Sequence, residues 1–247
     1  MTRILYYEKY LMKHDIKYKH SNSVHNLNSS NKVVPIIIEM FKPASVLDVG
    51  CGIGTWLKSF IDLGVVDVLG IDGDYVNREQ LSEHIEPVNF LAKDLSLPFD
   101  LGRKFDVVIS LEVAEHLPES TAAEFVDSLV KHGDIIIFSA AIPSQGGQNH
   151  LNEQWKKYWI DLFARHQYSV YDLIRPRIWD MQEVDYWYKQ NMIVFGKFNL
   201  LHLKPPNTSI LEAIHPEMFA AKLEWLSNYI NQLHEQNLHL ENKIGNE

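Results

Sequence analysis

The sequence predicts an α/β fold with a doubly wound sheet and a separate C-terminal coiled-coil helix. Short runs rich in β-branched residues alternate with helix-length segments from residue 44 to about residue 200. This alternation is typical of βαβ units, in which helices cover both faces of a parallel sheet. A glycine-rich loop follows the first of these runs, and a heptad repeat occupies the end of the sequence.

The composition limits the class of protein. A chain of 247 residues is long enough for one well-buried domain and an appendage. The 46% hydrophobic and 11% aromatic residues exclude disorder over most of the chain. No apolar run approaches the roughly 20 residues of a membrane-spanning helix, and the first residues lack the apolar core of a signal peptide. The single cysteine, Cys51, fits a reducing compartment, so we expect a cytoplasmic protein. A net charge of −9 argues against a nucleic-acid partner.

Residues 1–43 are assigned to an N-terminal arm. Residues 1–32 hold six Lys and Arg against two acids, with four tyrosines between them. Two interpretations stay open: a helical arm that packs its aromatic side chains on the domain, or a lid over a site. Helical spacing over 31–41 predicts a helix that Lys42 and Pro43 end.

Residues 44–200 are assigned to the main domain. The strand-like runs are short and bounded by turn residues, and the segments between them have the length of helices. Strands are expected at 46–49, 65–71, 88–92, 105–111, 134–140, 168–173 and 192–198, and helices at 55–63, 78–85, 120–131 and 152–165.

Residues 201–216 are expected to be a linker, and residues 217–247 a coiled-coil helix. Apolar side chains recur with the narrow 3.5-residue period of a coiled coil, whereas a helix docked on the domain, which is the alternative, would show a wider stripe. In a coiled coil, β-branched residues at a and leucine at d favour two parallel helices, and Asn237 at an a position favours the same arrangement. We therefore expect a homo-oligomer, with a dimer as the first choice and a trimer as the second. The seam has Leu223, Ile230, Asn237 and Ile244 at a, and Leu226, Leu233 and Leu240 at d.

The glycine-rich loop is the sharpest local signal. The segment VLDVGCGIGTW (46–56) runs from a buried strand through three alternate glycines into a helix. Glycines let the chain turn tightly and let a ligand approach the main chain, at the sheet edge where open α/β sheets bind ligands. Thr55 stands where a dinucleotide fingerprint has its third glycine, and Asp48 would repel a pyrophosphate but suit an ammonium group. Both residues argue against the competing interpretation, a NAD-dependent oxidoreductase.

Asp72 ends the second predicted strand, 22 residues after Gly50, where a carboxylate can bind ribose hydroxyls. Together with the loop, it resembles the cofactor signature of class I S-adenosylmethionine-dependent methyltransferases. The resemblance covers residues 44–198 and implies a Rossmann-like seven-stranded sheet in the order 3-2-1-4-5-7-6, with the last strand antiparallel. Asp94 resembles the family's adenine-binding position, although a helix N-cap is an alternative. The cofactor-binding residues expected in this way are Asp48, Gly50, Gly52, Gly54, Trp56, Asp72, Gly73, Asp94, Leu95 and Leu111.

Two histidines are candidates for the proton acceptor. An alcohol that is methylated must lose a proton, and histidine is the usual base near neutral pH. His116 follows the fourth predicted strand and His150 the fifth, so both reach the carboxyl edge of the sheet. We expect His116, His150 and Glu112 to be catalytic.

A metal is the alternative use of the same segment. Glu112, Glu115 and His116 would share one face of a helical turn, and with His150 they could hold Mg²⁺, Mn²⁺ or Zn²⁺. This set resembles the metal site of small-RNA end methyltransferases and a run in ubiquinone-type O-methyltransferases. Metal-free members of the superfamily carry the same run, with its glutamate and histidine supporting the cofactor loop. Three roles therefore stay open for these residues: metal ligand, general base and structural support.

Aromatic and amide side chains are concentrated toward the end of the domain, either as a core cluster or as a platform for a sugar ring. They are the segment 148–158, Trp159, Trp179, Trp187 and Tyr188. The segment from His150 to Trp159 resembles an HxNxQxxxYW-like stretch of methyltransferases encoded among bacterial surface-polysaccharide genes. The resemblance implies an S-adenosylmethionine-dependent O-methyltransferase that acts on a sugar hydroxyl of a bacterial surface glycan.

Three alternatives accompany this expectation. The first is a metal-assisted RNA-end or small-molecule O-methyltransferase. The second is a cofactor-binding scaffold that assembles through the coiled coil. The third concerns the seam, which could pair with a glycan-assembly partner that offers its own heptads.

Overall fold

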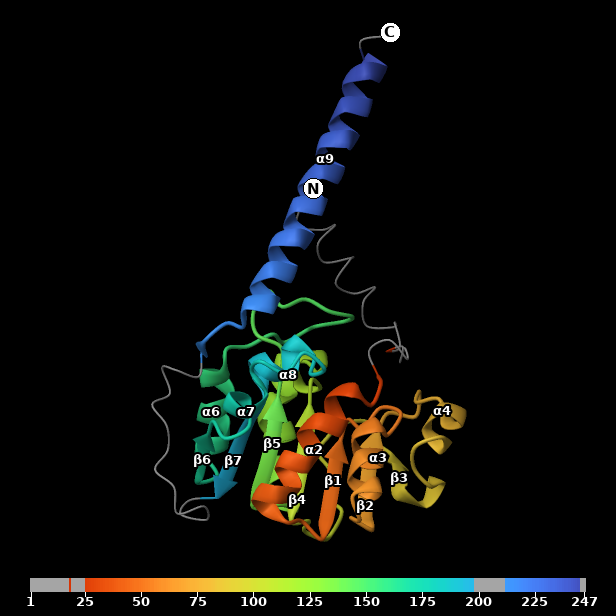
Figure 1. The fold of residues 1–247 in the computed structure, drawn as a ribbon, viewed down its shortest axis with the longest axis vertical. Coiled ribbons are helices and arrows are strands. Elements are labelled where there is room, and N and C mark those ends of the chain that lie inside the picture. The colour runs from red at the N-terminus through yellow and green to blue at the C-terminus, as the bar shows by residue number, and fades with distance from the viewer. Residues whose placement is uncertain (1–17, 19–24, 198–211, 245–247) are drawn as a thin grey trace.

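A computed structural model describes residue 18, residues 25–197 and residues 212–244 of the chain, without the side chains of 239–244. Its centre is a seven-stranded sheet in the order β3-β2-β1-β4-β5-β7-β6 (Figure 1). The pairs from β3 to β5 are parallel, and β7 is antiparallel to both β5 and β6. The strands are β1 (Ser45–Val49), β2 (Asp67–Asp72), β3 (Phe90–Ala92), β4 (Val107–Leu111), β5 (Ile135–Ser139), β6 (Tyr168–Tyr171) and β7 (Ile193–Lys197). The predicted strand order and the antiparallel last strand are confirmed.

The α-helices of the described residues agree with the expected segments, with two additions. Those in the main domain are α2 (Asn28–Phe41), α3 (Thr55–Asp62), α4 (Arg78–Ser82), α5 (Ala122–His132) and α6 (Lys156–Ala164). The additions are α7 (Arg175–Ile178) and α8 (Tyr186–Asn191), which precede β7. Both are too short to leave a hydrophobic period in the sequence.

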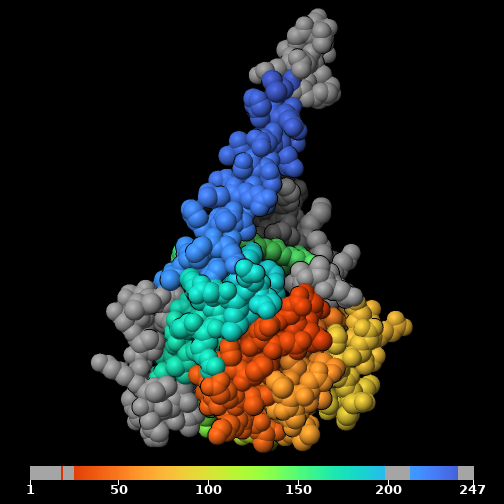
Figure 2. All heavy atoms as spheres, viewed as in Figure 1, coloured from red at the N-terminus to blue at the C-terminus, as the bar shows by residue number. Residues whose placement is uncertain are grey.

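Apolar clusters cover both faces of the sheet. On one face α2 and α3 pack side by side through residues such as Val33 and Phe60, and α7 and α8 continue this layer (Figure 2). On the other face α5 and α6 bury Phe125 and Trp159. The Trp159 ring lies 5.2 Å from that of Phe138 and is 1% exposed. Trp159 is therefore a core residue, and its interpretation as a sugar platform is wrong.

The helix α9 (Pro216–Ile244) projects from the domain as a single rod (Figures 1 and 2). Met218 is buried and Lys222 is half-buried, whereas every residue from 223 to 238 is exposed. The alternative of a docked C-terminal helix is therefore wrong for this stretch. The exposed seam comprises Leu223, Leu226, Ile230, Leu233 and Asn237, and the side chains of Leu240 and Ile244 lie outside the described residues.

None of the helices described for this chain combines the length and the apolar character that crossing a membrane requires. Most of the N-terminal arm and of the linker also lies outside the described residues.

Candidate functional site

Two adjoining cavities open at the carboxyl ends of the parallel strands. The first, of about 610 Å³, lies beside the ends of β2 and β3, and the second, of about 360 Å³, lies between the glycine-rich loop and α8. Their walls share Tyr18, Gly50, Glu112 and His116. A ligand in the first cavity is therefore in reach of a ligand in the second.

The glycine-rich loop needs its glycines. Gly50, Gly52 and Gly54 have positive φ angles of 87°, 52° and 85°, a region that residues with a Cβ rarely adopt. A Cβ on Gly50 would lie 2.3 Å from Cγ2 of Val113, so this position has no room for a side chain. The amides of Gly50 and Cys51 both donate to the main-chain oxygen of Ile71, at 2.8 and 3.2 Å, which ties the loop to β2.

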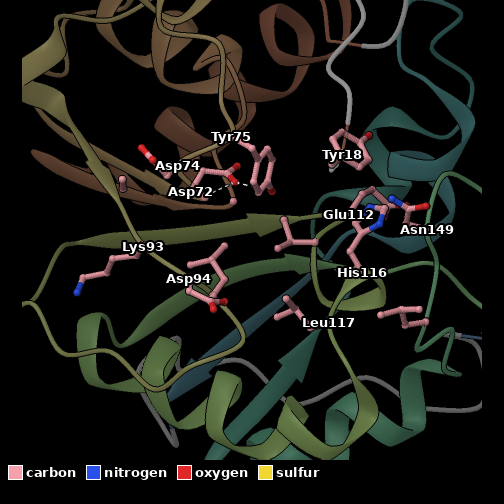
Figure 3. A pocket seen from close by; sticks show the side chains of 16 residues that line it. Tyr18, Asp72, Asp74, Tyr75, Lys93, Asp94, Glu112, His116, Leu117 and Asn149 are labelled. Carbon is pink, nitrogen blue, oxygen red and sulfur yellow. Dashed lines mark hydrogen bonds between the residues drawn. The ribbon is translucent and has the colours of Figure 1, made fainter. Parts of the chain in front are cut away.

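Asp72 is the anchor of the first cavity. Its Oδ2 accepts a hydrogen bond from the amide of Gly52 at 2.7 Å. Its Oδ1 accepts from the amide of Gly73 at 2.6 Å and from the hydroxyl of Tyr75 at 2.9 Å (Figure 3). Burial raises the pKa of Asp72, although these three hydrogen bonds oppose the shift.

The other expected cofactor residues fall into three groups. Gly73, Asp94 and Leu95 line the first cavity, while Gly52, Trp56 and Leu111 line the second. Asp94 also accepts from the amide and hydroxyl of Ser96 in a local turn, and no helix of the described residues begins there, so the alternative of a helix N-cap is wrong. Asp48 and Gly54 line neither cavity. Asp48 is buried beneath the loop, and its burial and the nearby charge of Asp72 raise its pKa well above the ordinary value.

Glu112 lies apart from the turn that follows it. Glu112 directly follows β4 and has a left-handed backbone, with a φ of 56°. The helical turn begins two residues later and comprises only Ala114–His116. Its carboxylate accepts from Nε2 of Gln145 at 2.9 Å and from Nδ2 of Asn191 at 3.1 Å. The expectation that Glu112 shares one helical face with Glu115 and His116 is therefore wrong. Burial raises the pKa of Glu112, while the amide hydrogen bonds oppose the shift.

Glu115, His116 and His150 come together instead. One ligand atom from each lies within 4.8 Å of the others, and the two imidazole rings are 4.9 Å apart (the His116 ring is visible in Figure 3). The main-chain oxygen of Glu115 accepts from the amides of Leu151 and Asn152, at 2.7 and 2.9 Å, which docks the loop after β5 onto the turn after β4.

The Glu115 carboxylate is buried, and no basic side chain of the described residues forms an ion pair with it. It is 0% exposed, and neither of its oxygens has a hydrogen-bond partner among the described residues. Burial, with the Glu112 charge second, raises its pKa well above the ordinary value, although the nearby backbone amides of Glu115 and Ala141 oppose the shift. His116 is also desolvated, which lowers its pKa to about 4, and its Nδ1 has no partner in the described part of the chain. A buried acid beside two imidazoles is a donor set that suits a divalent cation.

His150 is held in one orientation by Glu153. The distance from Nδ1 of His150 to the Oε1 atom of Glu153 is 2.8 Å. The same carboxylate accepts from the amides of Ser144 and Gly146, at 2.7 and 2.6 Å. Burial raises the pKa of Glu153, but these three hydrogen bonds together lower it below its ordinary value. A carboxylate hydrogen-bonded to one ring nitrogen fixes the orientation of a histidine, as a general base requires.

Sequence reasoning missed Glu153, although a His-x-x-Glu spacing was visible. It also missed Gln145 and Asn191, because they are far from Glu112 in the sequence and no local pattern joins them.

Aromatic and polar side chains surround the second cavity. Trp56 donates from Nε1 to the hydroxyl of Tyr188 at 3.4 Å, with ring centroids 5.1 Å apart. Of the aromatic residues singled out in the sequence, Trp187 and Tyr188 line this cavity, whereas Trp179 packs its ring on His215. Tyr18, from the N-terminal arm, lies in both cavity walls with its ring 5.0 Å from that of His116. Gln148, from the segment 148–158 singled out in the sequence, also lines this cavity, whereas the lining residues His25, Asn26, Ser29, Asp185 and Tyr186 were missed.

Comparisons with curated proteins find O-methyltransferases. The ubiquinone biosynthesis O-methyltransferase of Bartonella quintana is 28% identical over 139 residues, which cover 50% of this chain and 48% of that protein. The corresponding protein of Cereibacter sphaeroides is 30% identical over 152 residues, 55% of this chain and 60% of that protein. The chain thus spans about half the length of the curated relatives that it matches.

Solved structures show the same fold. The methyltransferase domain of bacterial CtHen1-C superposes with a TM-score of 0.52 at 18% identity, over 70% of this chain and 100% of that one. The sugar N-methyltransferase KedS8 from Streptoalloteichus superposes with a TM-score of 0.55 at 14% identity, over 74% of this chain and 97% of that one. Residues 27–176, more than half of the sequence, match the family described as a methyltransferase domain, and the chain belongs to that family.

Proposed function

We propose that this protein is an S-adenosylmethionine-dependent O-methyltransferase that methylates a sugar hydroxyl of a bacterial surface glycan, in the cytoplasm. The observation that carries the proposal is the pair of adjoining cavities with Gly50, Glu112 and His116 in their common wall. The cofactor would occupy the first cavity and reach the common wall with its sulfonium, and the acceptor would occupy the second. Family membership and the O-methyltransferase names of the curated relatives support the reaction class.

The second cavity supports a hydroxylated ring as the acceptor. Tyr186 and Trp187 offer flat apolar faces, and the amides of Asn26, Gln145 and Gln148 offer hydrogen bonds around them. This combination suits a sugar ring, whose faces are apolar and whose edge carries hydroxyls. In the reaction the acceptor oxygen forms the new bond to the methyl carbon as the carbon–sulfur bond breaks. His150, oriented by Glu153, takes the hydroxyl proton.

The first prediction concerns the cofactor. Asp72→Asn should weaken the binding of S-adenosylhomocysteine roughly 10- to 100-fold, because an amide cannot replace the charged acceptor for ribose hydroxyls. Isothermal titration calorimetry measures the affinity. Asp67→Asn, at the other end of β2, is the control and should bind as the wild type does. A folded Asp72→Asn protein with wild-type affinity would overturn the assignment of the first cavity.

The second prediction concerns the acceptor. Incubation with methyl-labelled cofactor and a panel of glycans, sugars, phenols and short RNAs should place the label on a sugar hydroxyl, located by mass spectrometry. His150→Ala should lower turnover by roughly 10²–10⁴ while cofactor affinity stays unchanged. Label only on a phenol or on RNA would contradict the glycan acceptor. Cofactor binding with no transfer to any acceptor would contradict the enzyme and favour a scaffold.

A metal-assisted O-methyltransferase acting on a small molecule or an RNA end is the second candidate, and the unpartnered Glu115 carboxylate favours it. Glu115, His116 and His150 would hold Mg²⁺ or Mn²⁺, which supplies a Lewis acid that lowers the pKa of the acceptor hydroxyl. His150 would then be a ligand and not the base. Glu112 is excluded from the ligand set because its carboxylate is held by Gln145 and Asn191.

The third prediction separates these two candidates. If the metal site is real, calorimetry with Mn²⁺ should show binding that Glu115→Gln weakens at least about tenfold, because the amide lacks the charge. Glu112→Gln is the matched control and should bind Mn²⁺ as the wild type does. Exhaustive EDTA treatment should abolish methyl transfer and Mg²⁺ or Mn²⁺ should restore it. Absence of Mn²⁺ binding, with full activity after EDTA, would dismiss the metal and leave His150 as the base.

We also propose that α9 pairs with α9 of a second copy of the chain. A dimer is the first choice and a trimer the second. The described seam is exposed along its whole length, and a lone helix of 29 residues gains little stability in water without a partner for its apolar face. Asn237 at an a position can bond its counterpart across a dimer. Pairing with a glycan-assembly partner is the alternative.

The fourth prediction tests this association in the full chain. Light scattering at tens of micromolar should give twice the mass of one chain. Leu226→Glu combined with Leu233→Glu should give a monomer, because it places charges at two d positions. Asn228→Glu combined with Asn231→Glu adds the same charge outside the seam and should leave the dimer intact. A monomeric wild type would refute self-association.

A further inference from the structure

Three consecutive buried residues at the end of α8 join α9 to the site. Lys189 donates from Nζ to both carboxylate oxygens of Glu217 in α9, at 2.8 Å each. Gln190 donates from Nε2 to the main-chain oxygen of Ala213, at 2.8 Å, just before α9 begins. Asn191 donates to Glu112 and, at 2.8 Å, to Oε1 of Gln145. All three side chains are at most 1% exposed.

Lys222, in the second turn of α9, contacts the same part of the site directly. Its Nζ donates to the main-chain oxygen of Gln145 at 3.2 Å and lies against Gly146, where a Cβ would come within 3.2 Å of it. Gln145 in turn donates from Nε2 to Glu112. The backbone of Gln145 is thus held by α9, and its side chain holds Glu112.

The loop that contains Gln145 depends on such contacts. It connects β5 to α6 and has positive φ angles at Ser144 (69°), Gly146 (71°) and Asn149 (58°). Two of these are not glycines, so their conformation persists only where surrounding contacts hold it. Glu153 supplies such contacts from one side, through the amides of Ser144 and Gly146. Lys222 supplies a contact from α9.

We propose that the first two turns of α9 support the acceptor site from outside the cavity, with Lys222 as a positioning residue that holds Gln145 and, through it, Glu112. This inference rests on the proposed function in one respect, that the second cavity receives the acceptor. Lys222 touches neither the cofactor nor the acceptor in this assignment. Its effect passes through the peptide of Gln145 and the loop that also carries His150.

Hydrogen exchange followed by mass spectrometry tests this role in the full-length protein. Lys222→Met keeps an unbranched side chain, shorter by one atom, and removes its charged donor. Exchange in peptides that cover 143–147 should rise roughly tenfold, as expected for the loss of a hydrogen bond to a charged group. Exchange in β1 and β4 should stay unchanged, and affinity for S-adenosylhomocysteine should stay within twofold, because the first cavity is not altered. Lys222→Arg should restore slow exchange.

The control is Gln232→Met, an exposed position ten residues further along α9. It should exchange as the wild type does. Unchanged exchange at 143–147 in Lys222→Met would overturn the proposal. A rise spread evenly over the whole domain would also overturn it, because that result reports general destabilisation. None of these measurements uses methyl transfer. The role of Lys222 can therefore be confirmed even if the proposed function is wrong, and it can be refuted even if the proposed function is right.

Discussion

The main-chain oxygen of Ile71 accepts two hydrogen bonds, from the amides of Gly50 and Cys51, and the site is organised around this junction. It fixes the glycine-rich loop to the end of β2, so that the amide of Gly52 meets the carboxylate of Asp72. The same close approach leaves no space for a side chain on Gly50, because Val113 fills it. Val113 lies between Glu112 and the turn that carries Glu115 and His116, so the glycine-rich loop and the segment that follows β4 constrain each other.

The buried carboxylates at the carboxyl edge of the sheet differ in how their charge is compensated. Near the loop, the charge of Asp72 is compensated by two backbone amides and a phenol hydroxyl. Further along the edge, Glu112 is compensated by the amides of Gln145 and Asn191, whereas the Glu115 carboxylate has no donor among the described residues. An uncompensated buried carboxylate is costly, so it takes up a proton or recruits a cation. Among the described residues at this edge, Glu115 therefore has the buried carboxylate whose charge is least compensated.

Much of the fold could be predicted from the sequence, because its signals are local. Each strand is a short β-branched run, and the glycine-rich loop with Asp72 carries a recognisable pattern that implied the strand order. The helices α7 and α8 could not be predicted, since four and six residues show no period. In the site, the proximity of His116 and His150 followed from parallel strands ending at one edge. The separation of Glu112 from Glu115 could not be predicted, because it depends on the left-handed backbone of Glu112 and on side-chain amides from distant segments of the sequence.

The tyrosine beside Asp72 has a consequence for ligand exchange. The Tyr75 hydroxyl donates to Oδ1 of Asp72, and its ring lies over Gly73, where a Cβ would come within 2.0 Å of it. A sugar hydroxyl that binds this oxygen competes with the phenol, so one hydrogen bond is swapped for another and the net free energy gained is small. The same exchange runs in reverse when a spent ligand leaves, because the phenol satisfies the carboxylate again and spares it a desolvated, unpaired state. If a ribose binds Asp72, as proposed above, this exchange is expected to lower the affinity for the ligand and to speed its release.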